Sequence, residues 1–171
     1  MSGGGTRSGI GIDSHAFAAG RPLILGGVEI PYERGLAGHS DADVLTHAVI
    51  DALLGAAGLG DIGQLYPDTD PAYAGADSLA LLADVLARLR EAGLRPVQVD
   101  TTVMMERPKL APHRDAIRAR LAAGLGVAVG DVNVKATTGE GMGFVGRGEG
   151  VAALAIATVA PADPAVPPRD R

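Results

Sequence analysis

Residues 38–48 read GHSDADVLTHA, and this stretch decides where the first helix begins and where chemistry is expected. Ser40 is a good N-cap, and Asp43 stands three residues later, where its side chain can bond back to the cap. Apolar residues then recur at helical spacing from residue 44 to residue 53. We therefore predict a helix that begins near Asp41.

The two flanks of this predicted helix differ in character. Asp43, His47 and Asp51 lie on one narrow stripe, because successive residues of a helix are rotated by about 100°. The apolar side chains occupy the other flank. We expect that flank to pack against a core and the polar stripe to present ligands.

The composition favours one α+β domain. The chain has 171 residues and 47% hydrophobic content, which is enough for a single sizeable core. Aromatic residues make up only 3% and tryptophan is absent, so Ala, Val, Leu and Ile must build that core. Side chains of this size suit helices packed closely on a sheet.

Charge and cysteine content exclude several classes of function. A net charge of −5 and a pI near 5.3 argue against nucleic acid as the main partner, because phosphate binding over a wide surface needs a basic face. No cysteine is present, which excludes disulfides and thiolate zinc sites and leaves histidine and carboxylate as metal ligands. The N-terminus lacks an apolar stretch of signal-peptide length, and the longest apolar run, residues 151–160, is about half of a membrane span. We expect a cytoplasmic protein with no membrane partner.

Upstream of the opening stretch, residues 9–13 (GIGID) alternate as a short strand would, and Asp13, Ser14 and His15 close it. Side chains two apart on a strand project to the same side, so Asp13 and His15 can reach one point in space. This is metal-ligand spacing. The alternative is a turn aspartate beside a surface histidine.

The remaining pattern predicts the rest of the architecture. A hairpin should turn at Gly26 and Gly27, and a helix should end before Gly124. The predicted order implies an α+β sandwich: a mixed, four-stranded-type sheet with helices on one face, plus a small hairpin. The predicted elements and domain limits are a hairpin at 23–31, helices at 77–92 and 112–123, strands at 97–105, 132–136 and 151–159, a disordered N-terminal extension at 1–8, one domain at 9–160, and a disordered Pro-rich tail at 161–171.

Two loops contain polar groups suited to binding. Residues 61–71 (DIGQLYPDTDP) form either a functional loop or a solvated connection. Residues 137–150 (TTGEGMGFVGRGEG) hold six glycines, which should form neither helix nor strand because each costs extra backbone entropy. Two threonines, Glu140 and Arg147 could bind phosphates there, directly and through a cation, although the Walker pattern is missing.

Clustered histidines raise the prospect of a metal. Asp13, His15 and one further histidine would supply three ligands, the number that a catalytic zinc commonly takes. His39 and His47 compete for the third place. The helical stripe favours His47, with Asp43 or Asp51 as the partner that orients it. His39 precedes the helix, where a flexible position suits contact with a ligand.

Many segments match a known family in unbroken order, from about residue 9 to residue 159. Together they resemble the 2-C-methyl-D-erythritol 2,4-cyclodiphosphate synthases of the non-mevalonate isoprenoid pathway. The segments are residues 11–15 (GIDSH), 22–32 (PLILGGVEIPY), 39–43 (HSDAD), His47, 60–63 (GDIG), 66–70 (YPDTD), 75–78 (GADS), 108–109 (PK), 131–138 (DVNVKATT) and 143–150 (GFVGRGEG).

The resemblance implies a metal-dependent phosphorus–oxygen lyase. The 2-phosphate of 4-diphosphocytidyl-2-C-methyl-D-erythritol 2-phosphate attacks the β-phosphate, which forms the cyclic diphosphate and releases CMP. Asp13, His15 and His47 would bind zinc as a Lewis acid and template, Glu140 would bind Mg²⁺ or Mn²⁺, and His39 and Thr138 would stabilise the transition state. The implied substrate-binding residues are Asp13, Ser14, His15, His39, Ser40, Asp61, Ile62, Gly63, Tyr66, Asp68, Asp70, Met105, Lys109, Ala111, Thr137, Thr138, Gly139, Glu140, Phe144 and Arg147.

The resemblance further implies a homotrimer with active sites between subunits. Phe144, Arg147 and Glu149 would then lie near the three-fold axis, where the family can hold an isoprenoid diphosphate. The family's usual TTTEK run is replaced here by TTGEG, in which Gly139 and Gly141 remove one hydroxyl and one cation. This departure predicts a changed affinity for the nucleotide. Ala42 replaces a usual glycine at the expected helix start, which should be tolerated.

Two other functions use the same residues. A zinc-dependent phosphoesterase would bind its metal through the same aspartate and histidines, but it would need an activated water and would release inorganic phosphate. A non-enzymatic module that binds a metal or an isoprenoid diphosphate would show no turnover of the cytidyl substrate.

Overall fold

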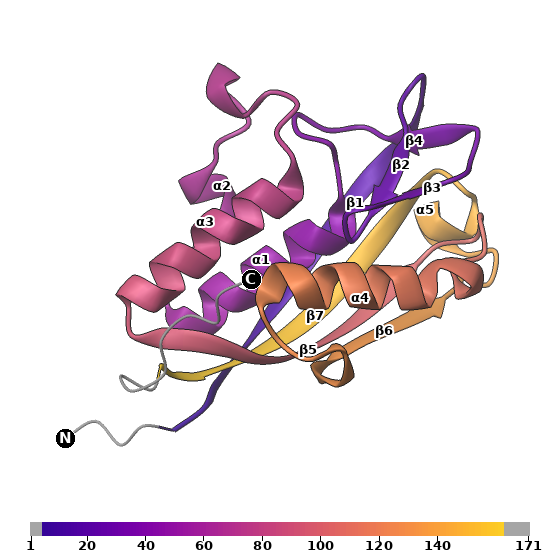
Figure 1. Ribbon diagram of the computed structural model, residues 1–171. Helices are drawn as coiled ribbons and strands as arrows, with labels where there is room; N and C mark the ends of the chain where they lie inside the picture. Colours follow the sequence, from indigo (N-terminus) through magenta and orange to yellow (C-terminus); the bar gives the residue numbers. More distant parts are fainter. Residues whose placement is uncertain (1–4, 163–171) are drawn as a thin grey trace.

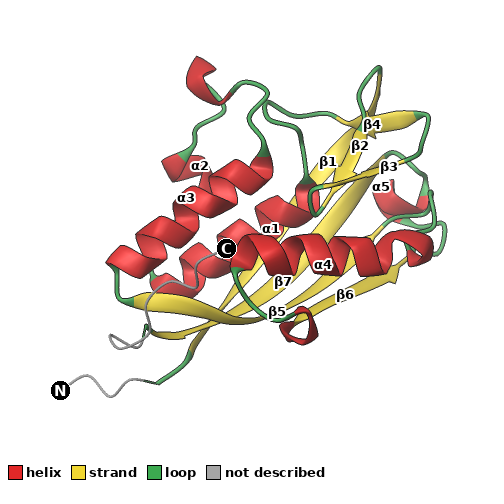
Figure 2. Cartoon of the chain, viewed as in Figure 1, coloured by secondary structure: helices red, strands yellow, loops and turns green. Residues whose placement is uncertain are grey.

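Helices cover one face of a mixed five-stranded sheet in the computed structural model, which describes residues 5–162 (Figures 1 and 2). The strand order is β4-β1-β7-β5-β6; β5 and β6 run parallel, and the other neighbours are antiparallel. The α+β class and the mixed sheet are thus as predicted. The strands are β1 (Arg7–Ala19), β4 (Arg34–Leu36), β5 (Leu94–Met104), β6 (Val132–Thr137) and β7 (Gly150–Pro161), and the main helices are α1 (Val44–Ala57), α3 (Ser78–Glu91) and α4 (Arg114–Leu125).

Short elements connect this framework. The predicted hairpin is confirmed, and Gly26 and Gly27 both have positive φ, 59° and 72°, as a two-residue turn requires. The sheet gains β4 as an edge strand that the sequence did not predict, since three residues carry too little pattern. The short elements are β2 (Leu23–Leu25), β3 (Val28–Ile30), α2 (Ile62–Leu65), η1 (Pro71–Tyr73), η2 (Ala111–His113), η3 (Val129–Asp131) and α5 (Gly143–Gly146).

The start of α1 differs from the prediction. The helix begins at Val44, and its N-cap is Asp43, whose carboxylate accepts a hydrogen bond from the Thr46 amide at 3.0 Å. Ser40 cannot cap it, because Ala42 has a φ of 58° and interrupts helical geometry before residue 43. Ala42 therefore lies in a left-handed turn ahead of the helix and not inside it.

Asp43 is fully buried, so the predicted polar stripe is wrong at this position. Its two carboxylate oxygens accept hydrogen bonds from the amides of Gly26 and Gly27 at 2.8 and 2.7 Å, and from the Thr46 hydroxyl at 2.7 Å. Burial raises the pKa of Asp43 even though these hydrogen bonds oppose the shift. This one carboxylate thus joins the β2–β3 hairpin to the first turn of α1.

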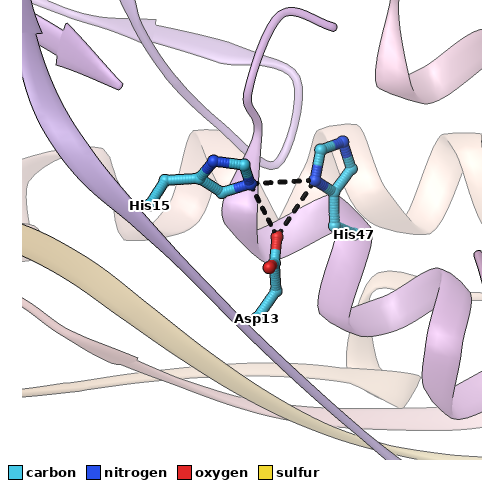
Figure 3. A group of neighbouring side chains, drawn as sticks. All are labelled: Asp13, His15 and His47. Atoms are coloured by element: carbon cyan, nitrogen blue, oxygen red, sulfur yellow. Dashed lines mark hydrogen bonds and ion pairs between the residues drawn. The ribbon is translucent and has the colours of Figure 1, made fainter. Parts of the chain in front are cut away.

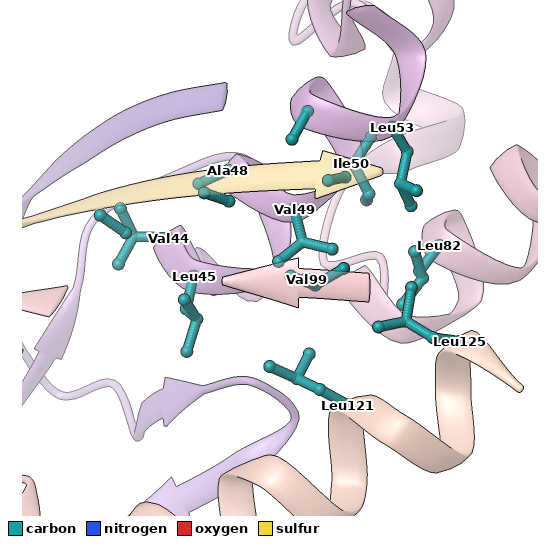
Figure 4. Close-up of a cluster of buried hydrophobic side chains, with 14 of the residues drawn as sticks. Val44, Leu45, Ala48, Val49, Ile50, Leu53, Leu82, Val99, Leu121 and Leu125 are labelled. Carbon is teal, nitrogen blue, oxygen red and sulfur yellow. The ribbon is translucent and has the colours of Figure 1, made fainter. Parts of the chain in front are cut away.

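The core lies between the sheet and the helices (Figure 4). Helix α1 is buried on most sides, where Leu45, Val49 and Leu53 meet side chains from α3, β5 and α4. Among residues 5–162, no helix is long and apolar enough to cross a bilayer. The labelled core side chains are Val44, Leu45, Ala48, Val49, Ile50, Leu53, Leu82, Val99, Leu121 and Leu125.

Glycines let α1 approach the backbone of β1 very closely. A Cβ atom on Gly11 would lie 1.9 Å from the carbonyl oxygen of Ala48, and one on Gly9 would lie 2.2 Å from that of Ala52. Real Cβ atoms do not approach backbone oxygens so closely, so only glycine fits at these two positions. The alternate residues Ile10 and Ile12 project from the opposite face of the sheet, where each side chain is 60% exposed.

Several predicted boundaries need correction. Helix α3 is as predicted, with Asp77 as N-cap. Helix α4 instead continues through Gly124 to Leu125, and the next residue, Gly126, has a φ of 71° and forms a left-handed C-cap. The glycine-rich segment forms the one-turn helix α5, which was not predicted. Strand β1 begins at Arg7, inside the extension expected to be disordered, and β7 reaches Pro161. The rest of the expected disorder, residues 1–4 and 163–171, lies outside the described residues.

We expect Gly11→Ala to lower the free energy of unfolding by about 3 kcal/mol, because the added methyl group must displace α1 from β1. Urea unfolding followed by circular dichroism measures this. The matched control is Gly55→Ala, which adds a methyl group to α1 on the other side of the same contact. Its Cβ would lie 3.8 Å from the Ile10 carbonyl oxygen, an ordinary contact. Helix propensity predicts that this control is neutral or gains up to about 1 kcal/mol. Equal effects of the two substitutions would contradict the close-approach argument.

Candidate functional site

The structure brings Asp13, His15 and His47 together, as predicted (Figure 3). The carboxylate oxygen Oδ2 of Asp13 lies 2.9 Å from His15 Nε2 and 3.0 Å from His47 Nδ1. The two histidine nitrogens are 3.3 Å apart. Three potential ligand atoms thus converge on one small volume.

Local structure explains this convergence. Asp13 and His15 are two residues apart on β1, and they project toward the helix layer, as do Gly9 and Gly11. Helix α1 packs directly on those glycines, which places the first turns of α1, and with them His47, beside Asp13 and His15 in the middle of β1. Of the two histidines that compete for the third place, His47 joins the group and His39 does not.

The hydrogen bond of His15 determines which of its nitrogens is free. Its Nδ1 lies 2.5 Å from the Ala37 carbonyl oxygen. A carbonyl oxygen can only accept, so Nδ1 carries a proton. The other nitrogen, Nε2, faces Asp13: it donates to the carboxylate when the ring is protonated, and it offers a lone pair to a metal when the ring is neutral. Burial raises the pKa of Asp13, but hydrogen bonds from His15 and His47 outweigh it and hold this pKa well below the usual range. Burial alone would lower the pKa of His15, but the hydrogen bond and charge of Asp13 raise it. A cation is therefore favoured between these side chains.

The group fits a zinc ion. In a tetrahedral site with bonds of about 2.0–2.1 Å, neighbouring ligand atoms lie about 3.3 Å apart, close to the separations in this group. Two imidazole nitrogens and one carboxylate oxygen are ligands that zinc accepts in catalytic sites. The side chains of Asp13, His15 and His47 keep 27%, 18% and 11% of their surface exposed, which leaves access for a fourth ligand.

The residues that orient His47 are not those expected. Asp43 holds the hairpin, and Asp51 accepts a hydrogen bond from the Ile62 amide at 2.7 Å. His47 Nε2 instead contacts two hydroxyl oxygens, that of Ser78 at 2.9 Å and that of Ser40 at 3.1 Å. Sequence reasoning missed Ser78, because it lies 31 residues away and its position at the start of a helix already accounts for a serine.

His39 lies on a restrained loop next to this group. Its Nε2 is 2.9 Å from the Asp70 carbonyl oxygen. The guanidinium of Arg21 donates hydrogen bonds to the carbonyl oxygens of Gly38 and Ser40, at 2.6 and 2.5 Å, and so holds the backbone on both sides of His39. The loop is therefore less free than the sequence suggested.

A second group of predicted residues surrounds a pocket at the other edge of the sheet. The pocket has a volume of about 220 Å³ and is lined by the end of β5, the following loop, the start of α4 and the end of β6. Arg114 was not predicted and adds a second cation beside Lys109. The lining residues are Val103, Met105, Lys109, Leu110, Ala111, Arg114, Ala136, Thr137 and Thr138.

Glu140 lies in the loop that follows this pocket and does not join the Asp13 group. Its Oε1 accepts a hydrogen bond from the Thr138 hydroxyl at 2.8 Å, and its φ of 52° is unusual for a residue with a side chain. The Gly139 amide donates to Glu106 Oε1 at 2.6 Å, which helps to hold the turn. The two predicted cation-binding regions therefore occupy separate parts of one chain.

Strand register gives the separation between the two regions. Asp13 of β1 pairs with Ala153 of β7, which pairs with Val103 of β5, which in turn pairs with Ala136 of β6. The two regions thus lie at the same level of the sheet but three strands apart. At about 4.8 Å per strand, the backbones are separated by about 14 Å.

Several other predicted substrate-binding residues already make polar contacts within the chain. Asp61 caps α2 and accepts from the Gln64 amide at 2.9 Å, Tyr66 donates to Asp84, and Asp70 accepts from the Ala72 amide at 2.9 Å. Ser14 alternates away from Asp13 toward the exposed sheet face. The remaining members are Ile62 and Gly63 in α2, Asp68 in the following turn, Phe144 in α5, and Arg147, which is paired with Glu149 at 2.8 Å.

Comparison with known proteins identifies the class. A family model described as the YgbB family matches residues 6–160, so the chain belongs to that family. Curated proteins named 2-C-methyl-D-erythritol 2,4-cyclodiphosphate synthase are similar to it. The one from Bordetella petrii is 59% identical, over 90% of this chain and 95% of that protein, and the one from Symbiobacterium thermophilum is 61% identical, over 89% and 97%. The resemblance seen in the motifs is thereby confirmed.

A solved structure agrees in fold. The structure titled 2C-methyl-D-erythritol-2,4-cyclodiphosphate synthase in its CDP-bound form has a TM-score of 0.82 and 38% identity, and the match covers 90% of this chain and 99% of that one.

We predict that His47→Ala abolishes stoichiometric zinc binding, because it removes one of three ligands from a small, preformed group. Metal content after loading with Zn²⁺ and dialysis, measured by atomic emission, checks this. His113→Ala in η2, outside the group, is the control and should retain zinc. Full zinc content in His47→Ala would place the metal elsewhere.

Proposed function

We propose that the protein is a 2-C-methyl-D-erythritol 2,4-cyclodiphosphate synthase, a CMP-releasing phosphorus–oxygen lyase of non-mevalonate isoprenoid biosynthesis. Its substrate is 4-diphosphocytidyl-2-C-methyl-D-erythritol 2-phosphate. The observation that carries the proposal is identity of about 60% to synthases of this name over most of both chains. The Asp13–His15–His47 group and the Lys109 pocket supply the chemical groups that such a reaction needs.

The reaction is an intramolecular phosphoryl transfer. An oxygen of the 2-phosphate forms a bond to the β-phosphorus, and the bond from that phosphorus to the oxygen bridging it to the α-phosphate breaks. CMP leaves with the bonding electron pair. The nucleophile is already anionic, so the barrier comes from charge crowding between phosphates. Positioning and cations should therefore supply most of the catalysis.

Asp13, His15 and His47 would hold zinc, because their ligand atoms already converge and the lone pair of His15 is directed inward. When bound, zinc supplies Lewis-acid polarisation and neutralises charge on a substrate phosphate. Glu140 would hold the second divalent cation, Mg²⁺ or Mn²⁺, since an accessible carboxylate is a ligand that such hard cations prefer.

The pocket at the β6 edge would take the cytidine diphosphate end. Its apolar wall includes Met105 and Ala111, while Thr137, Thr138 and Lys109 provide hydroxyls and a cation for the phosphates. The solved synthase structure titled as the CDP-bound form supports a cytidine diphosphate as the ligand. Arg114 is a further cation at the pocket and offsets part of the charge lost through Gly141, where the family usually has lysine.

His39 and Thr138 would stabilise the transition state, His39 from the loop held by Arg21 and Thr138 from the end of the pocket. Asp61 and Gly63 would contact the methylerythritol end, and Ser40, Ile62 and the 66–70 segment would make further substrate contacts. Tyr66, Asp68 and Asp70 lie in that segment, and Ser14 and Gly139 complete the proposed set.

A homotrimer would complete the site. In one chain the zinc group and the nucleotide pocket stand at opposite edges of the sheet, and α1 and α4 fill the space above the strands between them. A ring of subunits would bring the β6 edge of one copy beside the β1–β4 edge of the next. The exposed sheet face offers an apolar surface for this contact, because Ile10 pairs with Ile156 and Ile12 pairs with Leu154 across it. Phe144, Arg147 and Glu149 would lie near the axis and could accept an isoprenoid diphosphate.

The decisive experiment incubates the protein with the cytidyl substrate, Zn²⁺ and Mg²⁺, and follows CMP, cyclic diphosphate and inorganic phosphate together. CMP and cyclic diphosphate should appear in equal amounts without inorganic phosphate. Release of inorganic phosphate would instead identify a phosphoesterase. Binding without turnover would identify a binding module.

His39→Ala should keep zinc but slow turnover by about 10²-fold or more, because it removes one donor to the transition state. Single-turnover rates and zinc content are measured on the same sample. His113→Ala serves again as the control and should turn over normally. An undiminished rate in His39→Ala would remove His39 from the mechanism.

Replacing Ile12 by Asp should convert a trimer into smaller species, because it puts a charge on the face that would be buried between subunits. Analytical ultracentrifugation reads the assembly state. The control is Val129→Asp, which changes an exposed valine of η3 that is not on this sheet face. A monomeric wild-type protein, or an Ile12→Asp trimer, would contradict the assembly.

A further inference from the structure

On the side of His47 away from the proposed metal group, polar contacts lead from His47 through buried Ser78 to half-buried Asp41. His47 Nε2 lies 2.9 Å from Ser78 Oγ, and the Ser78 hydroxyl donates to Asp41 Oδ1. Ser78 is fully buried and His47 is 8% exposed. We propose that Ser78 and Asp41 are positioning residues, which fix the tautomer and direction of the His47 ring and so increase the affinity of the site for its metal.

The available protons determine the order of donors in this chain. A carboxylate can only accept, so the Ser78 proton is directed to Asp41. The Ser78 oxygen then has only its lone pairs to offer His47, and Nε2 must carry a hydrogen to bond with it. A neutral imidazole with hydrogen on Nε2 has its lone pair on Nδ1, the atom that lies 3.0 Å from Asp13 Oδ2. These two hydrogen bonds, from His47 to Ser78 and from Ser78 to Asp41, form a relay. The relay leaves Nδ1 of His47 without a hydrogen, so that this nitrogen can bind a metal.

Asp41 is held firmly enough to play this part. Its Oδ2 accepts a hydrogen bond from the Ser78 amide at 3.0 Å, and its Oδ1 accepts one from the Asp43 amide at 3.1 Å. The Asp41 amide in turn donates to the Ala76 carbonyl oxygen at 3.0 Å. The carboxylate is therefore fixed between the starts of α1 and α3, and it links the position of α3 to the direction of the His47 ring.

Ser40 has a weaker claim to the same role. Its hydroxyl oxygen is 3.1 Å from His47 Nε2, but it also accepts a hydrogen bond from the Ala42 amide at 3.2 Å. No carboxylate among its hydrogen-bond partners in the described chain directs its proton. Ser40 is compatible with either tautomer of His47, whereas the Ser78–Asp41 pair selects one. For histidine ligands of metals, loss of such a partner typically weakens metal affinity by about 10–100-fold.

The test measures the zinc dissociation constant by competition with a chromogenic chelator, which needs no enzymatic activity. Ser78→Ala should weaken zinc binding by about 10–100-fold, and Asp41→Asn should weaken it less, because an amide oxygen can still accept from the hydroxyl. Ser40→Ala should have a smaller effect than Ser78→Ala. The matched control is Thr101→Val on β5, which removes another buried hydroxyl. That hydroxyl donates to the Asn133 carbonyl oxygen of β6 at 3.0 Å. It should lower thermal stability comparably and leave zinc affinity unchanged.

A second measurement separates orientation from general loosening. Nitrogen-15 NMR of the imidazole rings, at a pH where His47 is neutral, should show hydrogen on Nε2 of His47 in the metal-free wild type and a mixture of tautomers in Ser78→Ala. Wild-type zinc affinity in Ser78→Ala, or hydrogen on Nδ1 in the wild type, would overturn the relay alone. The inference rests on the proposed metal centre, so a wild-type protein that binds no zinc would overturn both. Failure of the cytidyl substrate to react, with zinc bound normally, would affect only the proposed function.

Discussion

The close packing of helix α1 on the backbone of strand β1 is the contact on which the rest of the structure depends. Gly9 and Gly11 remove the side chains that would hold the helix away, so the helix rests against the strand itself. That closeness brings a histidine from the helix within 3.0 Å of an aspartate from the strand. The close approach of the two backbones is therefore what brings the side chains of Asp13, His15 and His47 together.

Buried polar groups then secure the helix at the site. Asp43 is fully buried, and it holds both the hairpin amides and the first turn of α1. A charge this deep is tolerated only because its oxygens are fully occupied by donors. On the other side of the same turn, Ser78 contacts His47 and donates a hydrogen bond to Asp41. The start of α1 is thus restrained from two directions, and these restraints fix the orientation of the His47 side chain.

The two faces of the sheet differ, because helices cover one face and leave the other exposed. The helix face carries the core, the Asp13–His15–His47 group and the pocket beside Lys109, whereas the other face carries paired isoleucine and leucine side chains. Such an apolar face is unusual for a surface left in water. In the proposed trimer, assembly through this face would join the Asp13 group of one copy to the Lys109 pocket of its neighbour, which lie three strands apart within one chain.

The sequence by itself determined the local features of this protein. Alternation in β1 was enough to pair Asp13 with His15, the Gly26–Gly27 turn was enough to predict the hairpin, and the helix predicted at 77–92 agrees with α3. Each of these depends on neighbours within a few residues, where strand and helix periods act directly. The family resemblance also rested on short motifs read in order.

Only the tertiary structure decided which residues serve each other across the chain. Asp43 matched the helix stripe yet turned inward to cap the helix and bind the hairpin, because the φ of Ala42 delays the helix start. Ser78 contacts His47 because α3 packs beside α1, and Arg114 reaches the pocket because α4 begins over the end of β6. These contacts span tens of residues and depend on how whole elements pack. Local periodicity specifies the face of an element, but only packing specifies what that face meets.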